Sequence, residues 1–370
     1  MQRDVVIVGG NHHNTQGVLR SLGQKGIKCI VVIHSQSESE CFVIKSKYVK
    51  EGYVEKDNNS LINKLKIIAE RYTEDNKPVI ICTSDEASSL VDCYHDELSK
   101  LYCIPGASKQ GLITAFMDKS CQISLAKELG LKIPTTWILN NTEDLVQVTY
   151  PCIVKPHSSV NGSKSDIRIF RNQEELTFFW NTTLQKPVLA QNYVEKDFEF
   201  QLLGCSLNKG NEVIIPGYTR IIRSSERTNT GVLNYQAIDF DIDIDKCQQF
   251  FRTTGYSGLF SMEFIHSKDG NNYFLEVNFR NDGNAICVTA AGVNLPYIWY
   301  LSQIGEDYDN EKAKQVHRVN VIPVFDDYFH FVRTKKIGVL KWLVDLCKAD
   351  CFMDIELGDL RPLFKRILKK

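Results

Sequence analysis

Residues 261–280 constrain the fold more than any other segment, because they read as one β-hairpin. Two runs of alternating apolar and polar residues, 261–267 and 272–280, flank the turn-forming residues Lys-Asp-Gly-Asn. If Ser267 pairs with Asn272, counting back along both strands puts Glu263 opposite Glu276, with their Cβ atoms about 5 Å apart. The sequence therefore predicts an antiparallel hairpin in which two carboxylates face each other.

The opposed carboxylates predict a metal site. Strand periodicity puts Asn278 on the same face as Glu276. The neighbouring apolar side chains are predicted to point to the other face: Leu275, Val277 and Phe279. Carboxylates at this distance repel unless a cation lies between them, and magnesium accepts one or two carboxylates together with phosphate oxygens and water. Glu263, Glu276 and Asn278 are the predicted ligands; a lone Glu-x-Asn on a strand would mean little.

The N-terminal region alternates strands with helices. Strands are predicted at 4–8, 28–33 and 78–82, and helices at 15–25, 59–71 and after residue 85. This order implies an open parallel sheet with ligands at the carboxyl ends of its strands. The loop after the first strand lacks G-x-G-x-x-G spacing, so no dinucleotide site is expected. His12 and His13 in this loop either touch a substrate or simply form a turn.

A lysine in the central region needs an anionic partner. A helix is predicted at 117–129 and strands at 150–156 and 166–171. Lys155 is flanked by Cys-Ile-Val and a proline, where an ionisable side chain is costly unless it is paired. The hydroxyls of Ser158 and Ser159 and the N–H groups beside Gly162 are candidates for covering phosphates, with Lys155 as a fixed cation. A plain hairpin loop explains the loop residues equally well.

The strand at 187–194 and the segment after it are candidates for holding a nucleoside. A base could lie against the backbone near Tyr193 and Val194, with Glu199 hydrogen-bonding a ribose. Because Glu199 alternates with Phe198 and Phe200, an ordinary solvated side chain explains it as well.

Arginines supply candidates for stabilising negative charge during a reaction. Arg280 follows the predicted metal strand directly, and Arg220 and Arg223 lie on a strand at 217–223. Surface arginines are common, so Arg280 has the better case because its position is tied to the metal strand.

Taken together, these motifs resemble the ATP-grasp superfamily, in order and in spacing. They are Met117-Asp-Lys119, Ile153-Val-Lys155-Pro, the serine-containing loop, Gln191-Asn-Tyr-Val with Glu199, Met262-Glu263-Phe and Glu276-Val-Asn278-Phe-Arg280. The resemblance covers roughly residues 4–301. The N-terminal sheet, including Ser46-Lys-Tyr-Val, resembles the carbamoyl-phosphate-synthase-like and D-aspartate-ligase-like members, which generally form amide or peptide-like bonds.

This resemblance implies an α/β (α+β ATP-grasp) fold in four parts. These are an N-terminal open parallel sheet (1–114), a small central lid subdomain (115–190), a C-terminal antiparallel-sheet subdomain (191–310) and an extension (311–370). It also implies ATP and Mg²⁺ as cofactors. Lys119 and Lys155 would hold phosphates, and Arg280 would meet the reacting phosphate. The implied nucleotide and metal residues are Gln191, Tyr193, Val194, Glu199, Glu263, Glu276 and Asn278. The loop at 158–165 departs from the pattern, with one glycine where relatives often have several.

Composition limits the partners and the compartment. Lys plus Arg (44) nearly cancels Asp plus Glu (45), so no bulk charge favours nucleic acid. No apolar run is long enough for a signal peptide or a membrane span, so a cytoplasmic protein is expected. The 12 cysteines form no CxxC pair, and most of them are expected to be reduced core residues. The basic C-terminal end is expected to dock on the sheet, to form a homodimer contact or to touch an anionic surface.

The function that follows is ATP-dependent ligation of a small-molecule carboxylate to an amine through an acyl phosphate. Two alternatives use the same residues. An ATP-grasp kinase would phosphorylate a hydroxyl and release no free phosphate, and a nucleotide sensor would bind ATP without turnover.

Overall fold

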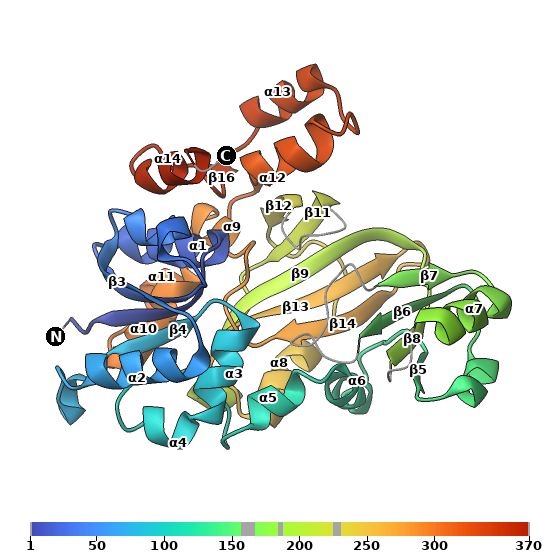
Figure 1. Cartoon of the computed structure of the whole chain (residues 1–370), viewed down its shortest axis with the longest axis horizontal. Helices are drawn as coiled ribbons and strands as arrows, with labels where there is room; N and C mark the ends of the chain where they lie inside the picture. The colour runs from blue at the N-terminus through green and yellow to red at the C-terminus, as the bar shows by residue number, and fades with distance from the viewer. Residues whose placement is uncertain (1, 157–166, 184–187, 225–230, 369–370) are drawn as a thin grey trace.

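The computed structural model describes residues 2–156, 167–183, 188–224 and 231–368. Its N-terminal part is a four-stranded parallel sheet in the order β3-β2-β1-β4 (Figure 1), which confirms the predicted open parallel sheet. The strands are β1 (Val5–Gly10), β2 (Cys29–His34), β3 (Val49–Glu55) and β4 (Val79–Cys82). The helices between and after them are α1 (His13–Gly23), α2 (Asn58–Ala69), α3 (Asp85–Cys93) and α4 (His95–Leu98).

Both faces of this sheet are buried, as expected for parallel strands with apolar residues in every position. One face, which includes Val6 and Val32, packs against α2 and α3. The other face, which includes Ile7 and Val31, packs against α1 and two later helices, α9 (Ile286–Ala290) and α10 (Leu295–Ile304). This second core also takes in side chains of the large antiparallel sheet, so the two sheets share one hydrophobic core.

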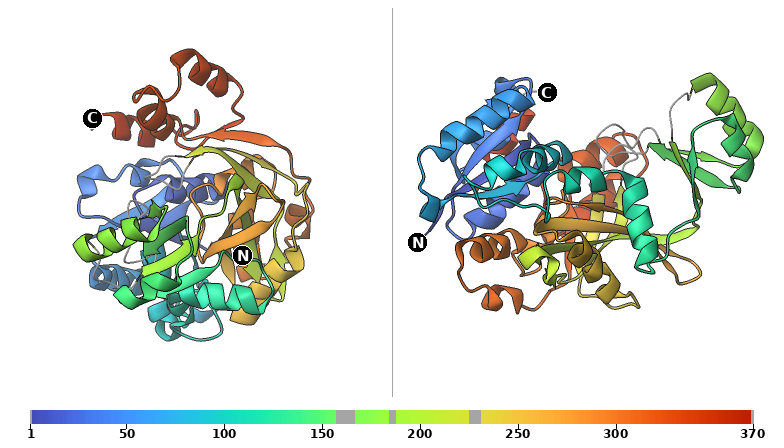
Figure 2. Two further views of the ribbon diagram at one scale, coloured as in Figure 1. Left: turned by 90° about the vertical axis from the view of Figure 1, so that its right-hand side faces the viewer. Right: turned by 90° about the horizontal axis from the view of Figure 1, so that it is seen from below.

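The lid is a separate four-stranded antiparallel sheet in the order β5-β8-β6-β7. It comprises β5 (Thr136–Leu139), β6 (Cys152–Pro156), β7 (Arg168–Phe170), α7 (Gln173–Thr183) and β8 (Val188–Asn192). Its own small core includes Val154 and Trp180. Figure 2 shows the lid standing away from the remainder of the chain.

The lid begins later than the predicted boundary at residue 115. Helices α5 (Leu112–Phe116) and α6 (Lys119–Glu128) precede it and pack on the large sheet. The side chain of Gln122 accepts a hydrogen bond from the Val277 N–H (2.7 Å) and donates one to the Val277 carbonyl (2.9 Å). Because Val277 lies on an edge strand, Gln122 satisfies backbone groups that would otherwise lack a strand partner.

The large sheet has the order β14-β13-β9-β11-β12-β15-β16, with β10 paired to β9. Its strands are β9 (Lys196–Leu207), β10 (Glu212–Ile214), β11 (Tyr218–Ser224), β12 (Gly231–Gln236), β13 (Gly258–Ser267), β14 (Asn272–Asn278), β15 (Val319–Ile322) and β16 (Cys351–Phe352). One face carries an aromatic core covered by α8 (Ile244–Thr254), in which Phe200 stacks on Phe264 with ring centroids 5.0 Å apart.

The C-terminal extension docks on the rest of the chain, and β15 and β16 complete the large sheet. Its helices are α11 (Asp309–Lys312), α12 (Val324–Asp327), a π-helical turn (Tyr328–Val332), α13 (Val339–Cys347) and α14 (Arg361–Ile367). Asp359 accepts a hydrogen bond from the Ser46 hydroxyl (2.6 Å), and Glu356 pairs with Arg20 (2.9 Å). Among the described residues, no helix combines the length and the hydropathy that crossing a membrane requires.

Candidate active site

The hairpin β13–β14 brings Glu263 directly opposite Glu276, which confirms the predicted pairing. The register near the turn differs from the prediction, because His266, and not Ser267, pairs with Asn272. A β-bulge between Glu263 and Phe264 shifts the register by one residue and restores the opposition.

The extra residue of the bulge is Leu275, since Phe264 pairs with Phe274 and Glu263 with Glu276. Leu275 is absent from the aromatic core that contains its neighbours Phe274 and Val277, and it lines the pocket beside Glu263, so its predicted position on the opposite face is wrong. Strict alternation fails here because a bulge places two residues of one strand against one residue of the other.

Polar groups surround the two carboxylates. Glu263 accepts hydrogen bonds from the amides of Gln201 (3.1 Å) and Asn278 (3.3 Å). The ammonium of Lys119, at the start of α6, lies 2.5 Å from a carboxylate oxygen of Glu276. Burial lowers the pKa of Lys119, but the charge of Glu276 outweighs it and leaves that pKa above its ordinary value. The facing carboxylates therefore already have a cation beside them.

Lys155 on β6 is a second cation directed at this site from the lid. Its side chain is buried, and burial together with the charge of Lys119 lowers its pKa to about 7, against the opposing effect of Glu276 and Glu263. An anion bound between the two lysines would stabilise the charged form of Lys155.

A pocket opens beside the carboxylates on the same face of the large sheet. Its lining includes Glu199 and Gln201 of β9, Ile221 and Ser224 of β11, and Glu263. Residues 199, 201 and 263 share this face because Gln201 pairs directly with Glu263. Glu199 forms an ion pair with Lys196 (2.7 Å) and is partly exposed.

The remaining predicted nucleotide residues lie at the junction between lid and large sheet. Gln191 is buried on β8 and donates to the Thr136 hydroxyl (2.8 Å). Tyr193 is exposed and Val194 half-buried in the connection from β8 to β9. Ser158, Ser159 and Gly162 lie outside the described residues.

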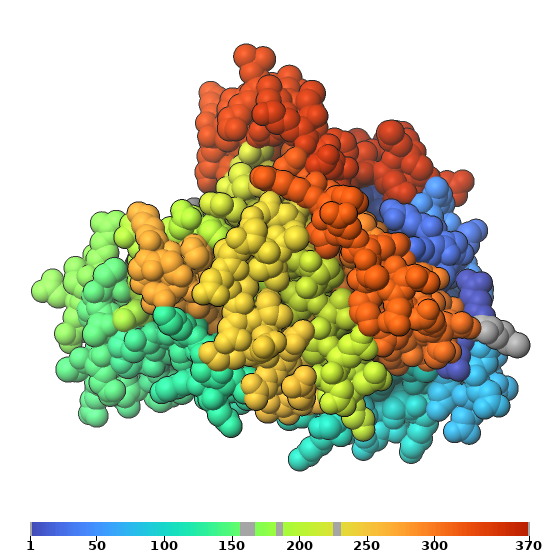
Figure 3. Space-filling model, turned by 180° about the vertical axis from the view of Figure 1, so that it is seen from behind, coloured from blue at the N-terminus to red at the C-terminus, as the bar shows by residue number. Residues whose placement is uncertain are grey.

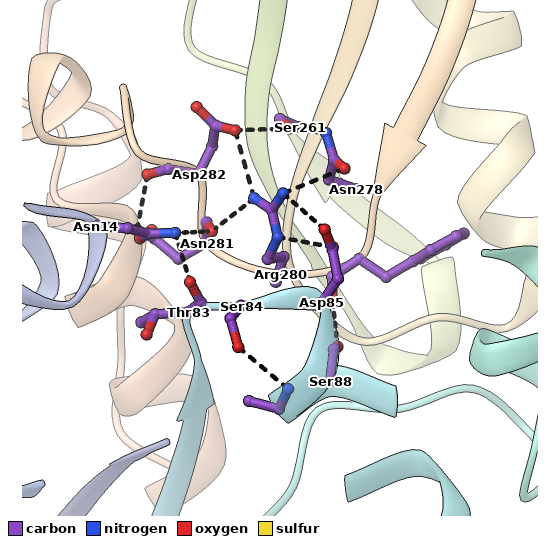
Figure 4. A network of polar contacts seen from close by, with 12 residues as sticks. Asn14, Thr83, Ser84, Asp85, Ser88, Ser261, Asn278, Arg280, Asn281 and Asp282 are labelled. Atoms are coloured by element: carbon purple, nitrogen blue, oxygen red, sulfur yellow. Dashed lines mark hydrogen bonds and ion pairs between the residues drawn. The ribbon is translucent and has the colours of Figure 1, made fainter. Parts of the chain in front are cut away.

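Arg280, just after β14, joins this predicted metal-binding strand to the N-terminal region (Figure 4). Its guanidinium donates two hydrogen bonds to the carboxylate of Asp85, at 2.7 and 3.2 Å, and contacts Asn278 (3.3 Å) and Asp282 (3.4 Å). Burial lowers its pKa, but Asp85 and Asp282 outweigh the burial and raise it, so Arg280 stays charged. Asp85 lies in the first turn of α3, just after the carboxyl end of β4.

The same junction contains a buried amide network. Asn14 donates to the carbonyls of Thr83 (2.8 Å) and Asn281 (2.6 Å), as Figure 4 shows. The Asn281 N–H donates to the Cys82 carbonyl (3.1 Å). This network fixes the segment that leaves β14 against the carboxyl ends of β1 and β4. His12 lies at the same edge, where burial, His13 and Arg280 lower its pKa to about 3, so it is neutral at pH 7.

Arg220 lies on the wrong face for the predicted catalytic role. It pairs with Phe200, whose side chain belongs to the aromatic core, and its guanidinium stacks over Phe198 with 4.2 Å to the ring centroid. Directly paired residues share a face, so Arg220 points away from Glu263. Arg223 instead holds the C-terminal extension, through Asp327 and Asp345 at 2.7 Å each.

Two residues that the sequence analysis missed support the site. Gln201 holds Glu263 and accepts a hydrogen bond from Asn284 (2.8 Å), and Asp85 holds Arg280. Gln201 carries a sequence signal, since it is a polar residue inside an apolar strand two positions after Glu199. Asp85 follows Thr83 and Ser84 at a strand end, the edge where parallel sheets bind ligands.

Comparisons with known proteins bear on the family and the fold. Residues 218–325 match the family described as "ATP-grasp in the biosynthetic pathway with Ter operon". The formate-dependent phosphoribosylglycinamide formyltransferase of Bacteroides fragilis is 22% identical over 237 residues, which cover 61% of this chain and 60% of that protein. The chain thus spans less than two thirds of this relative.

Solved structures share the fold. The L-amino acid ligase from Bacillus licheniformis superposes with a TM-score of 0.66 at 14% identity, covering 86% of this chain and 80% of that one. The biotin carboxylase domain of the Hydrogenobacter thermophilus 2-oxoglutarate carboxylase, solved with MgADP, ADP and bicarbonate, gives a TM-score of 0.64 at 20% identity, covering 83% and 71%. The protein has the ATP-grasp fold, as its sequence motifs predicted. Within that class, the family that matches residues 218–325 is described by its link to a Ter-operon biosynthetic pathway.

Proposed function

We propose that this protein is an ATP-dependent ligase that joins a small-molecule carboxylate to an amine through an acyl phosphate. The observation that carries the proposal is the facing pair Glu263 and Glu276, with Lys119 and Lys155 beside it and Arg280 at the end of the same strand. A protein of the same fold supports it, because the Bacillus licheniformis protein is an L-amino acid ligase.

The donor set fits magnesium. Two carboxylates and one amide are hard oxygen ligands, and the described residues contain no group of three or more His, Cys, Asp or Glu side chains that could hold a metal by themselves. Such a site suits an ion that completes its coordination with phosphate oxygens and water. The amide of Asn278 now turns its Nδ2 toward Glu263, so ligation by Oδ1 requires this amide to turn over. Magnesium, when bound by Glu263, Glu276 and Asn278, would offset phosphate charge.

The nucleotide would lie between the lid and the large sheet. Lys119 and Lys155 would hold its phosphates, and an anion beside Lys155 would raise the pKa of this lysine from about 7. Glu199 would accept hydrogen bonds from the ribose, and the connection at 191–194 would face the base.

The reaction needs positioning and charge stabilisation more than acid–base chemistry. An oxygen of the substrate carboxylate attacks the γ-phosphorus, the bond to ADP breaks, and an acyl phosphate forms. The amine nitrogen then attacks the acyl carbon, the C–N bond forms, the amine loses a proton and phosphate leaves. Arg280, held in place by Asp85, would stabilise the charge that develops on the transferred phosphoryl group. The cytoplasmic location and the homodimer both remain predictions.

The decisive experiment measures phosphate release from ATP with magnesium and a panel of amino acids, singly and in pairs. We expect release that needs both a carboxylate and an amine and that disappears in Glu276→Gln. ADP formation without free phosphate would indicate a kinase, and ATP binding without turnover would indicate a sensor; either result would overturn the ligase proposal.

A further inference from the structure

Helix α13 presents an apolar face that the described part of the chain leaves uncovered. Its exposed large side chains are Val339 (58% exposed), Leu340 (81%), Leu343 (46%) and Val344 (49%). The exposed thiol of Cys347 lies on the same side, and no residue of the helix is buried. At about 100° per residue these five positions span roughly 140° of the helix circumference. They are called the α13 face below.

The opposite side of α13 fixes the helix to the molecule. Trp342 packs against Tyr328, with ring centroids 5.5 Å apart, and Asp345 forms an ion pair with Arg223 of β11 at 2.7 Å. The helix is therefore anchored by one side, and its apolar side is held outward. Figures 1 and 3 show the C-terminal segment standing out at one end of the molecule.

Basic residues are concentrated in the segment that contains the α13 face. Residues 333–348 contain Arg333, Lys335, Lys336, Lys341 and Lys348 against one carboxylate, Asp345, which gives this segment a net charge of +4. The whole chain has a net charge of −1, so the remainder carries −5. At about 100° per residue, Lys348 and Lys341 lie roughly 40° and 60° beyond Val344, both at one border of the apolar arc, where long side chains can keep their charge in a polar layer.

We propose that the α13 face docks on an anionic phospholipid surface. An apolar helix face bordered by lysines is the pattern of helices that lie in a membrane interface, where apolar burial and attraction to anionic headgroups act together. A second copy of the chain fits less well, because a symmetric contact would bring two segments of charge +4 together. Docking would leave the active-site pocket close to the surface, since Arg223, which holds α13, lies between the pocket residues Ile221 and Ser224.

The test is flotation of the full chain with vesicles of phosphatidylcholine alone or of phosphatidylcholine and phosphatidylglycerol at 2:1. We expect binding to the anionic vesicles only, weakened by salt. Leu340→Glu with Leu343→Glu should abolish it. Lys335→Gln with Lys348→Gln should weaken it about 25-fold, at roughly fivefold per charge. Val146→Glu with Phe178→Glu, two exposed apolar residues elsewhere, is the matched control and should bind normally.

All these substitutions are at exposed positions, so unchanged circular dichroism and melting temperature should accompany them. Sedimentation velocity without lipid tests the alternative that a second copy of the chain covers the α13 face. A dimer that the Leu340→Glu, Leu343→Glu variant dissociates would overturn the proposal in favour of a second copy. Absence of binding to anionic vesicles, or binding that the α13 variants and the control share equally, would also overturn it.

Discussion

Along the same stretch of β9 and β13, one face of the large sheet is polar and the other is aromatic. On one face, Glu199, Gln201 and Glu263 surround the candidate active site; on the other, Phe200 packs between Phe198 and Phe264. The two sets alternate along β9 and β13, so each polar residue of the site is next in the sequence to a phenylalanine of the core. Strand periodicity thus builds a polar site directly on a rigid aromatic layer, and a register slip of one residue would exchange the two.

The sharpest way to test this division is to change neighbouring residues on the two faces. Glu263→Gln keeps size and shape and removes one predicted ligand charge. We expect kcat for ATP-dependent phosphate release to fall about 10²–10³-fold, with little change in melting temperature. Glu195→Gln, the same change at an exposed carboxylate, should leave both unchanged. Near-normal activity in Glu263→Gln would remove the metal assignment.

The next residue should give the opposite result. Phe264 is fully buried against Phe200 and Phe274, with centroids 5.0 and 5.7 Å away. Phe264→Ala should lower the free energy of unfolding by about 3–5 kcal/mol through lost burial and a cavity. Urea unfolding gives this value, and kcat at low temperature should survive. A large loss of kcat in a still folded Phe264→Ala protein would show that the two faces are not separable.

Arg280 connects the polar face of the large sheet to the N-terminal region, and a substitution of Asp85 tests this connection. Asp85→Asn removes a charge that holds the guanidinium at 2.7 Å. As a positioning residue, Asp85 should affect kcat about 10–100-fold and leave the KM for ATP almost unchanged. Glu86→Gln, the exposed next residue, is the matched control. A rise in KM with constant kcat would assign Asp85 to ATP binding instead.

Local pattern and long-range contact explain which parts of this site could be predicted. The opposition of Glu263 and Glu276 follows from period-two alternation around a short turn, and it held although the bulge at Leu275 was invisible in the sequence. The pair Asp85–Arg280 joins residues 195 positions apart, one in the first turn of α3 and one just after β14, so no local pattern reveals it. The face of Arg220 depends on the register between β9 and β11, which alternation within one strand cannot fix.

Protonation of Lys155 should make ATP affinity depend on pH. Its pKa is about 7 in the unliganded protein, lowered by burial and Lys119, and phosphate would raise it. ATP binds best to the charged lysine, so affinity should be constant below pH 7 and fall by up to about tenfold per pH unit above it. Calorimetry at pH 8 in buffers of different ionisation enthalpy should detect proton uptake on binding. Lys155→Met should bind ATP more weakly and without this proton uptake.

The smallest expected effect belongs to Arg220, the arginine on the aromatic face. Arg220→Gln removes a cation over Phe198 and a partly exposed contact with Asp197 at 3.7 Å, worth together about 1 kcal/mol of stability. Phosphate release should stay within about twofold of wild type, whereas Arg280→Gln, the same change on the polar face, should lower kcat at least about 10²-fold. If both variants lost activity equally, Arg220 would have to reach the reacting groups, and the assignment of catalysis to one face of this sheet would fail.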